Sequence, residues 1–271
     1  MKVKIASILV GLLCIIGLAI YLIWQGIPLL LAGAVRLVPV SWEDKLGQAV
    51  VAGITRTDTV CTDEPTRELM TKVLTRLEAS MPKTPYRFDV QVVRNPIVNA
   101  MAAPGGHIIV YSGLIDRMDN PEQLAAVLAH EMQHVVQRHS MKGMVRAIGL
   151  QAVLSLVLGD AGILGDLAGN LTALQFIRSD EESADDAALQ TLLRARIAPS
   201  EMQKAFGNLA KSENGDPLEG SLKYLSTHPP LSERIERVRV NTIGWHGVTH
   251  PIDAKMSVPC AATRPASGKI P

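Results

Sequence analysis

Two histidines four residues apart, inside a helix with a well-marked start, constrain this chain more than any other feature. Asn120 and Pro121 are typical of a helix N-cap and first helical position, and apolar residues follow at helical spacing as far as His139. Within this helix lies the sequence His130-Glu131-Met132-Gln133-His134. The spacing places both imidazoles on one helix face, where they can bind one Zn²⁺, and it sets Glu131 beside the metal as a general base.

A catalytic zinc site needs a third protein ligand and an open fourth position. A histidine six residues after His134 would supply the ligand in one arrangement, but position 140 is Ser, and His139 falls one residue short. The acidic segment 178–185 offers a carboxylate instead. Glu181 and Asp185 share one face of a predicted helix, so we expect Glu181 to bind the metal and Asp185 to orient a ligand histidine. A solvated charged helix face is the alternative.

The chain from residue 36 to about residue 255 indicates one domain of the α+β class, mainly α. Apolar positions between Glu64 and Met81 recur at helical spacing and predict an amphipathic helix. Alternation around 88–92, and a β-branched run at 108–111 after a Gly-rich turn, predict a small sheet of two or three strands. The pattern is then helical to about residue 240, and residues 256–271 form a tail without periodicity.

Residues 1–35 predict one transmembrane helix that anchors this domain. Positions 5–35 carry no charge, and 5–24 alone would give roughly 30 Å of helix. Lys2 and Lys4 precede the run, which favours a cytoplasmic N-terminus and an extracytoplasmic (periplasmic) domain. A cleaved signal peptide ending near Ala32-Gly33-Ala34 is the alternative, although the apolar run is longer than such peptides usually have.

Charge and cysteine content restrict the compartment and the partners. Lys and Arg number 27 against 26 Asp and Glu, and aromatic residues make up 4%, so we expect no nucleic-acid partner. Cys61 and Cys260 would be free to pair in an oxidising compartment. Two unrelated buried thiols are equally compatible with the sequence.

The chain resembles the HtpX and CAAX prenyl protease family of gluzincin metallopeptidases (metallopeptidase family 48), in particular its small extracytoplasmic members with one N-terminal anchor. The resemblance covers about residues 39–240 and rests on four ordered segments, 99–106, 130–134, 178–185 and 226–229. It implies a zincin-like fold with a small sheet and one Zn²⁺ per chain. The implied metal ligands are His130, His134 and Glu181, with Glu131 as the catalytic base.

The resemblance also implies roles for residues outside this set. His228 becomes a second catalytic residue that stabilises the oxyanion, where it would otherwise cap a helix. Asp185 orients a metal ligand, and Arg178 and Arg234 pair with carboxylates at the site. The edge strand would bind a substrate peptide as an additional strand through Asn99, Ala100 and Ala102, although the same segment also reads as a turn.

These observations predict a membrane-anchored zinc endopeptidase of the inner membrane that acts in envelope protein quality control. The resemblance and the membrane location together imply that its substrates are unfolded or damaged membrane or envelope proteins. A zinc-stabilised, non-catalytic chaperone-like module is the alternative, which the presence of Glu131 disfavours, and an assembly factor that works through its anchor is a third. Segment 147–177, rich in glycine and poor in charge, would be a gate over the site, a segment that dips toward the membrane interface, or a buried helix followed by a glycine-rich turn.

Overall fold

The structure, a computed structural model, describes residues 15–18, 21, 33, 35–157, 176–210, 227, 228 and 231–262. The chain divides into two units, Met1–Pro39 and Val40–Pro271. Most of the predicted anchor, most of segment 147–177 and the end of the predicted tail lie outside the described residues. Across the described ranges, no helix has both the length and the apolar character needed to cross a membrane.

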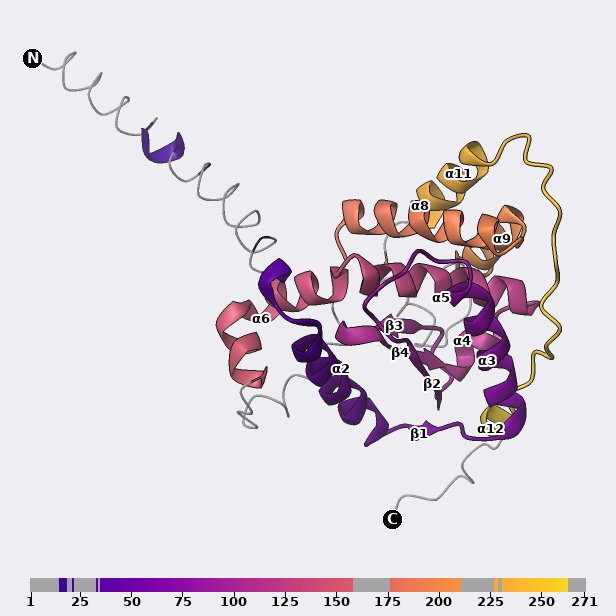
Figure 1. The fold of residues 1–271 in the computed structure, drawn as a ribbon, viewed down its shortest axis with the longest axis horizontal. Helices are drawn as coiled ribbons and strands as arrows, with labels where there is room; N and C mark the ends of the chain where they lie inside the picture. The colour runs from indigo at the N-terminus through magenta and orange to yellow at the C-terminus, as the bar shows by residue number, and fades with distance from the viewer. Residues whose placement is uncertain are drawn as a thin grey trace, which may run out of the picture. The chain divides into compact units, whose positions relative to one another are not determined.

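A small mixed sheet lies at the centre of the second unit, with the strand order β1-β2-β4-β3 (Figure 1). The strands are β1 (Thr59–Val60), β2 (Asp89–Arg94), β3 (Ala100–Ala102) and β4 (His107–Tyr111). β2 and β4 run parallel, whereas β1 and β3 are antiparallel to their neighbours. The prediction of two or three strands missed β1, because a two-residue strand is too short to show a period.

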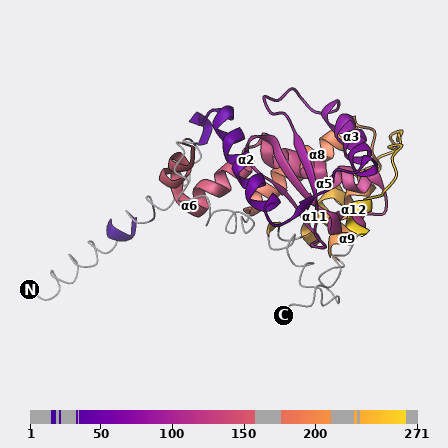
Figure 2. The same cartoon turned by 90° about the horizontal axis from the view of Figure 1, so that it is seen from below.

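Helices make up most of the rest, which confirms the predicted α+β, mainly α class. They are α2 (Val40–Thr55), α3 (Glu64–Glu78), α4 (Ser112–Asp116), α5 (Pro121–Val136), α6 (His139–Val157), α8 (Arg178–Arg194), α9 (Pro199–Ala210), α11 (Leu231–Asn241) and α12 (Pro259–Ala262), with a 3₁₀ turn at Pro104–Gly106. α2 and α3 lie at opposite sides of the sheet in both views (Figures 1 and 2). α5 packs against β3, α3, α8 and α9 and is the central helix of the fold.

α5 begins where the sequence predicts and ends earlier. The Asn120 side chain accepts a hydrogen bond from the Gln123 N–H at 2.9 Å, and Pro121 is the first helical residue. The predicted continuation to His139 is wrong, because Arg138 adopts a left-handed φ of 60° and a new helix starts at His139. α5 therefore carries the His130–His134 segment in its last two turns, and every residue of this segment is buried.

A disulfide joins Cys61 to Cys260, whose Cα atoms are 5.5 Å apart. It connects the segment before α3 to α12, across 199 residues of sequence. The chain between α11 and α12 is held further by Ile252, whose N–H donates to Glu122 Oε1 at 2.5 Å. The segment before α12 is thus bound to the first turn of α5. The Cys61–Cys260 pairing, which the sequence left open, is present.

Candidate metal and active site

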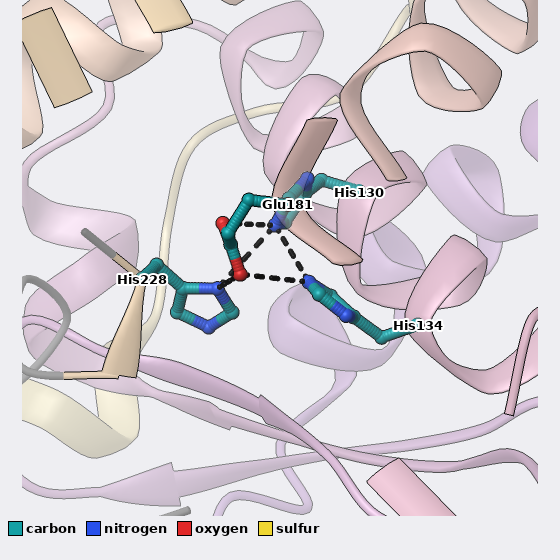
Figure 3. Close-up of side chains that lie close together, drawn as sticks. All are labelled: His130, His134, Glu181 and His228. Carbon is teal, nitrogen blue, oxygen red and sulfur yellow. Dashed lines mark hydrogen bonds and ion pairs between the residues drawn. The ribbon is translucent and has the colours of Figure 1, made fainter. Parts of the chain in front are cut away.

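Four buried side chains from three separate segments point toward one another (Figure 3). His130 and His134 come from α5, Glu181 comes from the first turn of α8, and His228 lies shortly before α11. α5 and α8 pack along each other, which brings a histidine pair and a carboxylate face to face across their interface. The structure therefore brings all three predicted metal ligands together.

The donor atoms of the three predicted ligands have the separations expected around one small divalent ion. His130 Nε2 lies 2.9 Å from His134 Nε2, and each of these nitrogens lies 3.4 Å from an oxygen of Glu181. Ligand atoms of a tetrahedral zinc site with bonds near 2.0–2.1 Å are about 3.3 Å apart. Two imidazoles and one carboxylate also form the donor set of a catalytic zinc site, so the residues fit the metal.

His228 completes the cluster. Its Nδ1 lies 2.9 Å from Glu181 Oε1 and 3.4 Å from His130 Nε2. One ligand atom from each of the four residues falls within a common span of 4.8 Å. The His228 side chain therefore lies within the buried cluster of donor atoms, in contact with both Glu181 and His130.

Glu131 is buried beside the cluster and is held by the edge strand. Its Oε2 accepts a hydrogen bond from the Ala102 N–H at 3.1 Å, and the Ala102 carbonyl accepts one from Ser140 Oγ at 2.7 Å. Glu131 Oε1 makes no hydrogen bond to the described residues and lies 3.5 Å from His228 Nε2. One carboxylate oxygen is thus fixed and the other is left to accept a proton from a molecule in the site.

Asp185 and Arg234 form a layer of charge behind His130 and Glu181. Asp185 Oδ1 lies 2.8 Å from His130 Nδ1, where a second-layer carboxylate orients a ligand imidazole. Arg234 binds Asp185 through Nε at 2.7 Å and Nη2 at 2.8 Å, and its Nη1 lies 2.7 Å from Glu181 Oε2. The guanidinium also lies 4.4 Å above the Phe206 ring. The Arg234 guanidinium therefore contacts both buried carboxylates.

Arg178 does not reach the cluster, contrary to the role that the resemblance implies. Its side chain is 66% exposed and pairs with Glu182 at 3.2 Å and with Glu233. Arg178 and Glu182 are one helical turn apart on the outer face of α8, which makes this pairing the nearest one available. Of the two arginines proposed to serve the site, only Arg234 contacts its carboxylates.

Burial and opposite charges set the protonation of the cluster. Burial alone would raise the pKa of Glu181, but the surrounding imidazoles hold this pKa well below its ordinary range. Burial and Arg234 lower the pKa of His130, yet the Asp185 and Glu181 carboxylates outweigh them and raise it to about 9. Burial, with the neighbouring His130, keeps the pKa of His134 well below its ordinary value. Metal binding at neutral pH therefore competes with a proton on His130.

The sequence predicts neither of two residues that contact His134. His139 Nδ1 lies 3.1 Å from His134 Nδ1, and the Phe176 ring stacks on the His134 ring with centroids 3.8 Å apart. Burial lowers the pKa of His139 to about 4, so this imidazole is neutral. His139 follows a helix break that no glycine or proline marks, and a single phenylalanine carries no signal of its own.

The three residues proposed to bind substrate differ in what their backbone groups already contact. The Asn99 carbonyl faces β4 and accepts from the Tyr111 N–H at 3.1 Å. The alternation of an antiparallel ladder turns the backbone groups of Ala100 and Ala102 to the outer edge, but those of Ala102 are taken by side chains of α5 and α6. In the described chain, Ala100 alone of the three keeps its outward N–H and C=O without a hydrogen bond.

Known proteins match the segment that contains this site. Residues 63–242 match the model of Peptidase family M48. The metalloprotease LoiP of Escherichia coli (strain K12) is 34% identical over 178 residues, which are 63% of this chain and 68% of LoiP. The beta-barrel assembly-enhancing protease of the same strain is 33% identical over 59% of this chain and 35% of its own length.

A mitochondrial metalloendopeptidase is also similar to this chain. The metalloendopeptidase OMA1 of Schizosaccharomyces pombe is 28% identical over 64% of this chain and 52% of its own length. The chain thus spans about two thirds of LoiP but only about half of this OMA1. The family model matches more than half of the chain, and the matched range holds every member of the cluster. The chain therefore belongs to peptidase family M48 and is a metallopeptidase.

Proposed function

We propose that this chain is a zinc-dependent endopeptidase whose metal ligands are His130, His134 and Glu181. The observation that carries the proposal is the position of Glu131 Oε1, which is buried 3.5 Å from His228 Nε2 of the cluster and makes no hydrogen bond to the described residues. A binding module has no use for such a carboxylate, whereas hydrolysis needs one. When bound, zinc supplies the positive charge that polarises a peptide carbonyl and lowers the pKa of water to about 7.

Glu131 acts as the base and then as the acid. The Ala102 N–H holds Oε2, so the carboxylate cannot rotate away, and Oε1 accepts a proton from the attacking water. The same oxygen returns the proton to the amine that leaves when the peptide bond breaks. Because the carboxylate is completely buried, it is kept from exchanging that proton with bulk solvent.

His228 stabilises the charge that develops on the carbonyl oxygen. Its Nδ1 lies next to Glu181 Oε1, and its Nε2 lies 3.5 Å from Glu131 Oε1. An oxygen atom that reacts beside Glu131 is therefore within reach of this imidazole.

An extended polypeptide would bind along β3, an edge strand of the sheet. The outward N–H and C=O of Ala100 would hydrogen-bond to it, which selects an unfolded chain rather than a particular sequence. The Ala102 N–H instead donates to Glu131, so the pairing of the substrate strand with β3 would end before Ala102, next to the catalytic base. Main-chain recognition of this kind suits unfolded or damaged proteins.

We place the protein in the inner membrane, anchored by a helix within residues 1–35, with the peptidase domain in the periplasm. The uncharged run 5–35 supports the anchor, and the Cys61–Cys260 disulfide supports an oxidising compartment. One relative is named for enhancing beta-barrel assembly. Unfolded or damaged membrane and envelope proteins are therefore the proposed substrates, and quality control of the envelope the proposed process.

Removing the metal tests this function. Treatment of the full-length protein with a chelator should reduce cleavage of an unfolded, fluorescently labelled polypeptide to background, because polarisation of the carbonyl is lost. One equivalent of Zn²⁺ should restore it, whereas a His134→Ala variant should stay inactive after the same addition. Cleavage that continues at full rate in the chelator would rule out a metal-dependent reaction.

A further inference from the structure

The junction between α5 and α6 turns the first residues of α6 back toward the cluster. Arg138 adopts φ 60°, which is uncommon for a residue with a side chain. Its Nε lies 2.7 Å from Glu43 Oε1 and 3.1 Å from the Tyr86 hydroxyl, and both partners are buried. α2 therefore holds the left-handed residue in place, and the next side chain, His139, is 2% exposed and faces His134.

The contact between the two imidazoles has only one arrangement of protons that leaves His134 able to bind a metal. His134 Nε2 faces His130 and Glu181, so its lone pair must stay free and the ring proton must sit on Nδ1. His139 Nδ1, 3.1 Å away, then accepts this proton's hydrogen bond. The remaining N–H of His139 is at Nε2, which lies 3.4 Å from Ser183 Oγ and 3.5 Å from Asp180 Oδ1.

We propose that His139 is a positioning residue for His134: it accepts the hydrogen bond of His134 Nδ1–H and so presents the Nε2 lone pair to the metal. The inference rests on the proposed metal site. The two ligand histidines are then supported differently, since His130 Nδ1 is bound directly by the Asp185 carboxylate at 2.8 Å. Behind His139 stands the carboxylate of Asp180, which accepts from Arg146 at 2.9 Å.

Zinc affinity of the full-length protein, measured by competition with a chromogenic chelator, tests this role. His139→Leu removes the acceptor and should weaken binding about 10- to 100-fold, the usual cost of losing such a partner. His139→Asn places an amide oxygen near the position of Nδ1 and should restore most of the affinity, whereas His139→Gln, whose amide lies farther out, should not. His246→Leu, at an exposed histidine, is the control.

The unfolding free energy of each metal-free variant in urea separates positioning from folding. The inference predicts that Asn and Gln variants of similar metal-free stability differ in zinc affinity, and this comparison remains valid if the leucine variant does not fold. Equal zinc affinity of wild type and the leucine or glutamine variant, or equal weakening by asparagine and glutamine, would overturn the role of His139 alone. A wild-type protein that binds no zinc would overturn the proposed metal site itself.

Discussion

Glu131→Gln is expected to lower kcat by about 10²- to 10⁴-fold while leaving the fold and the zinc content unchanged. The amide oxygen of glutamine can still accept from the Ala102 N–H, which holds Glu131 Oε2 at 3.1 Å, so the side chain should keep its place. It has no basic oxygen to take the proton of the attacking water. Steady-state cleavage of the labelled polypeptide and metal analysis of the same preparation measure both quantities.

Glu182→Gln is the matched control for this substitution. Glu182 lies on the outer face of α8 and pairs with Arg178 and Arg237 at 3.2 Å, away from the cluster. Its activity should equal that of the wild type. A Glu131→Gln variant that retains full activity would show that the base is a different group, and one that loses its metal would show that Glu131 serves the metal site structurally.

Arg234→Met should destabilise the metal-free protein by about 3–5 kcal/mol, the cost of breaking a buried ion pair on one side. Arg234 contacts Glu181 and Asp185, all three are buried, and methionine replaces the stem of the side chain without its charge. The two carboxylates would then lose their shared cation. Urea unfolding with chelator present measures the change.

Arg237→Met, on the same helix, provides the comparison. Arg237 pairs with Glu182 and Asp186, but its side chain is 38% exposed, so the loss should stay below about 1 kcal/mol. Equal stability of the two variants would mean that Arg234 does not compensate the buried carboxylates. The experiment does not depend on activity, so it tests the charge layer independently of the peptidase reaction.

The local chemistry of the central helix could be predicted from the sequence because its signals are short in range. The N-cap Asn120, the following Pro121 and the four-residue spacing of the histidines each act within one or two turns. The same is true of Glu181 and Asp185, whose four-residue spacing predicts a shared helix face. The structure places both carboxylates against His130. Such patterns need no knowledge of distant residues.

What the sequence could not supply depends on tertiary contacts. The left-handed Arg138 carries no glycine signal and is fixed by Glu43 and Tyr86, so neither the early end of α5 nor the place of His139 could be foreseen. Arg178 pairs with Glu182 of its own helix and also with Glu233 of α11, and the second of these partners depends on tertiary packing. The family resemblance implied that Arg178 and Arg234 both pair with carboxylates at the site. The fold shows that only Arg234 does so, whereas Arg178 pairs with Glu182 and Glu233.

The zinc content of the purified full-length protein tests the central claim most directly, together with that of Glu181→Gln, His134→Ala and the neighbouring control Glu182→Gln. The account predicts about one zinc per chain in the wild type and in Glu182→Gln, and loss of zinc in the other two, because a catalytic site depends on three protein ligands. A folded wild-type protein without zinc, or full zinc content in Glu181→Gln, would contradict the account.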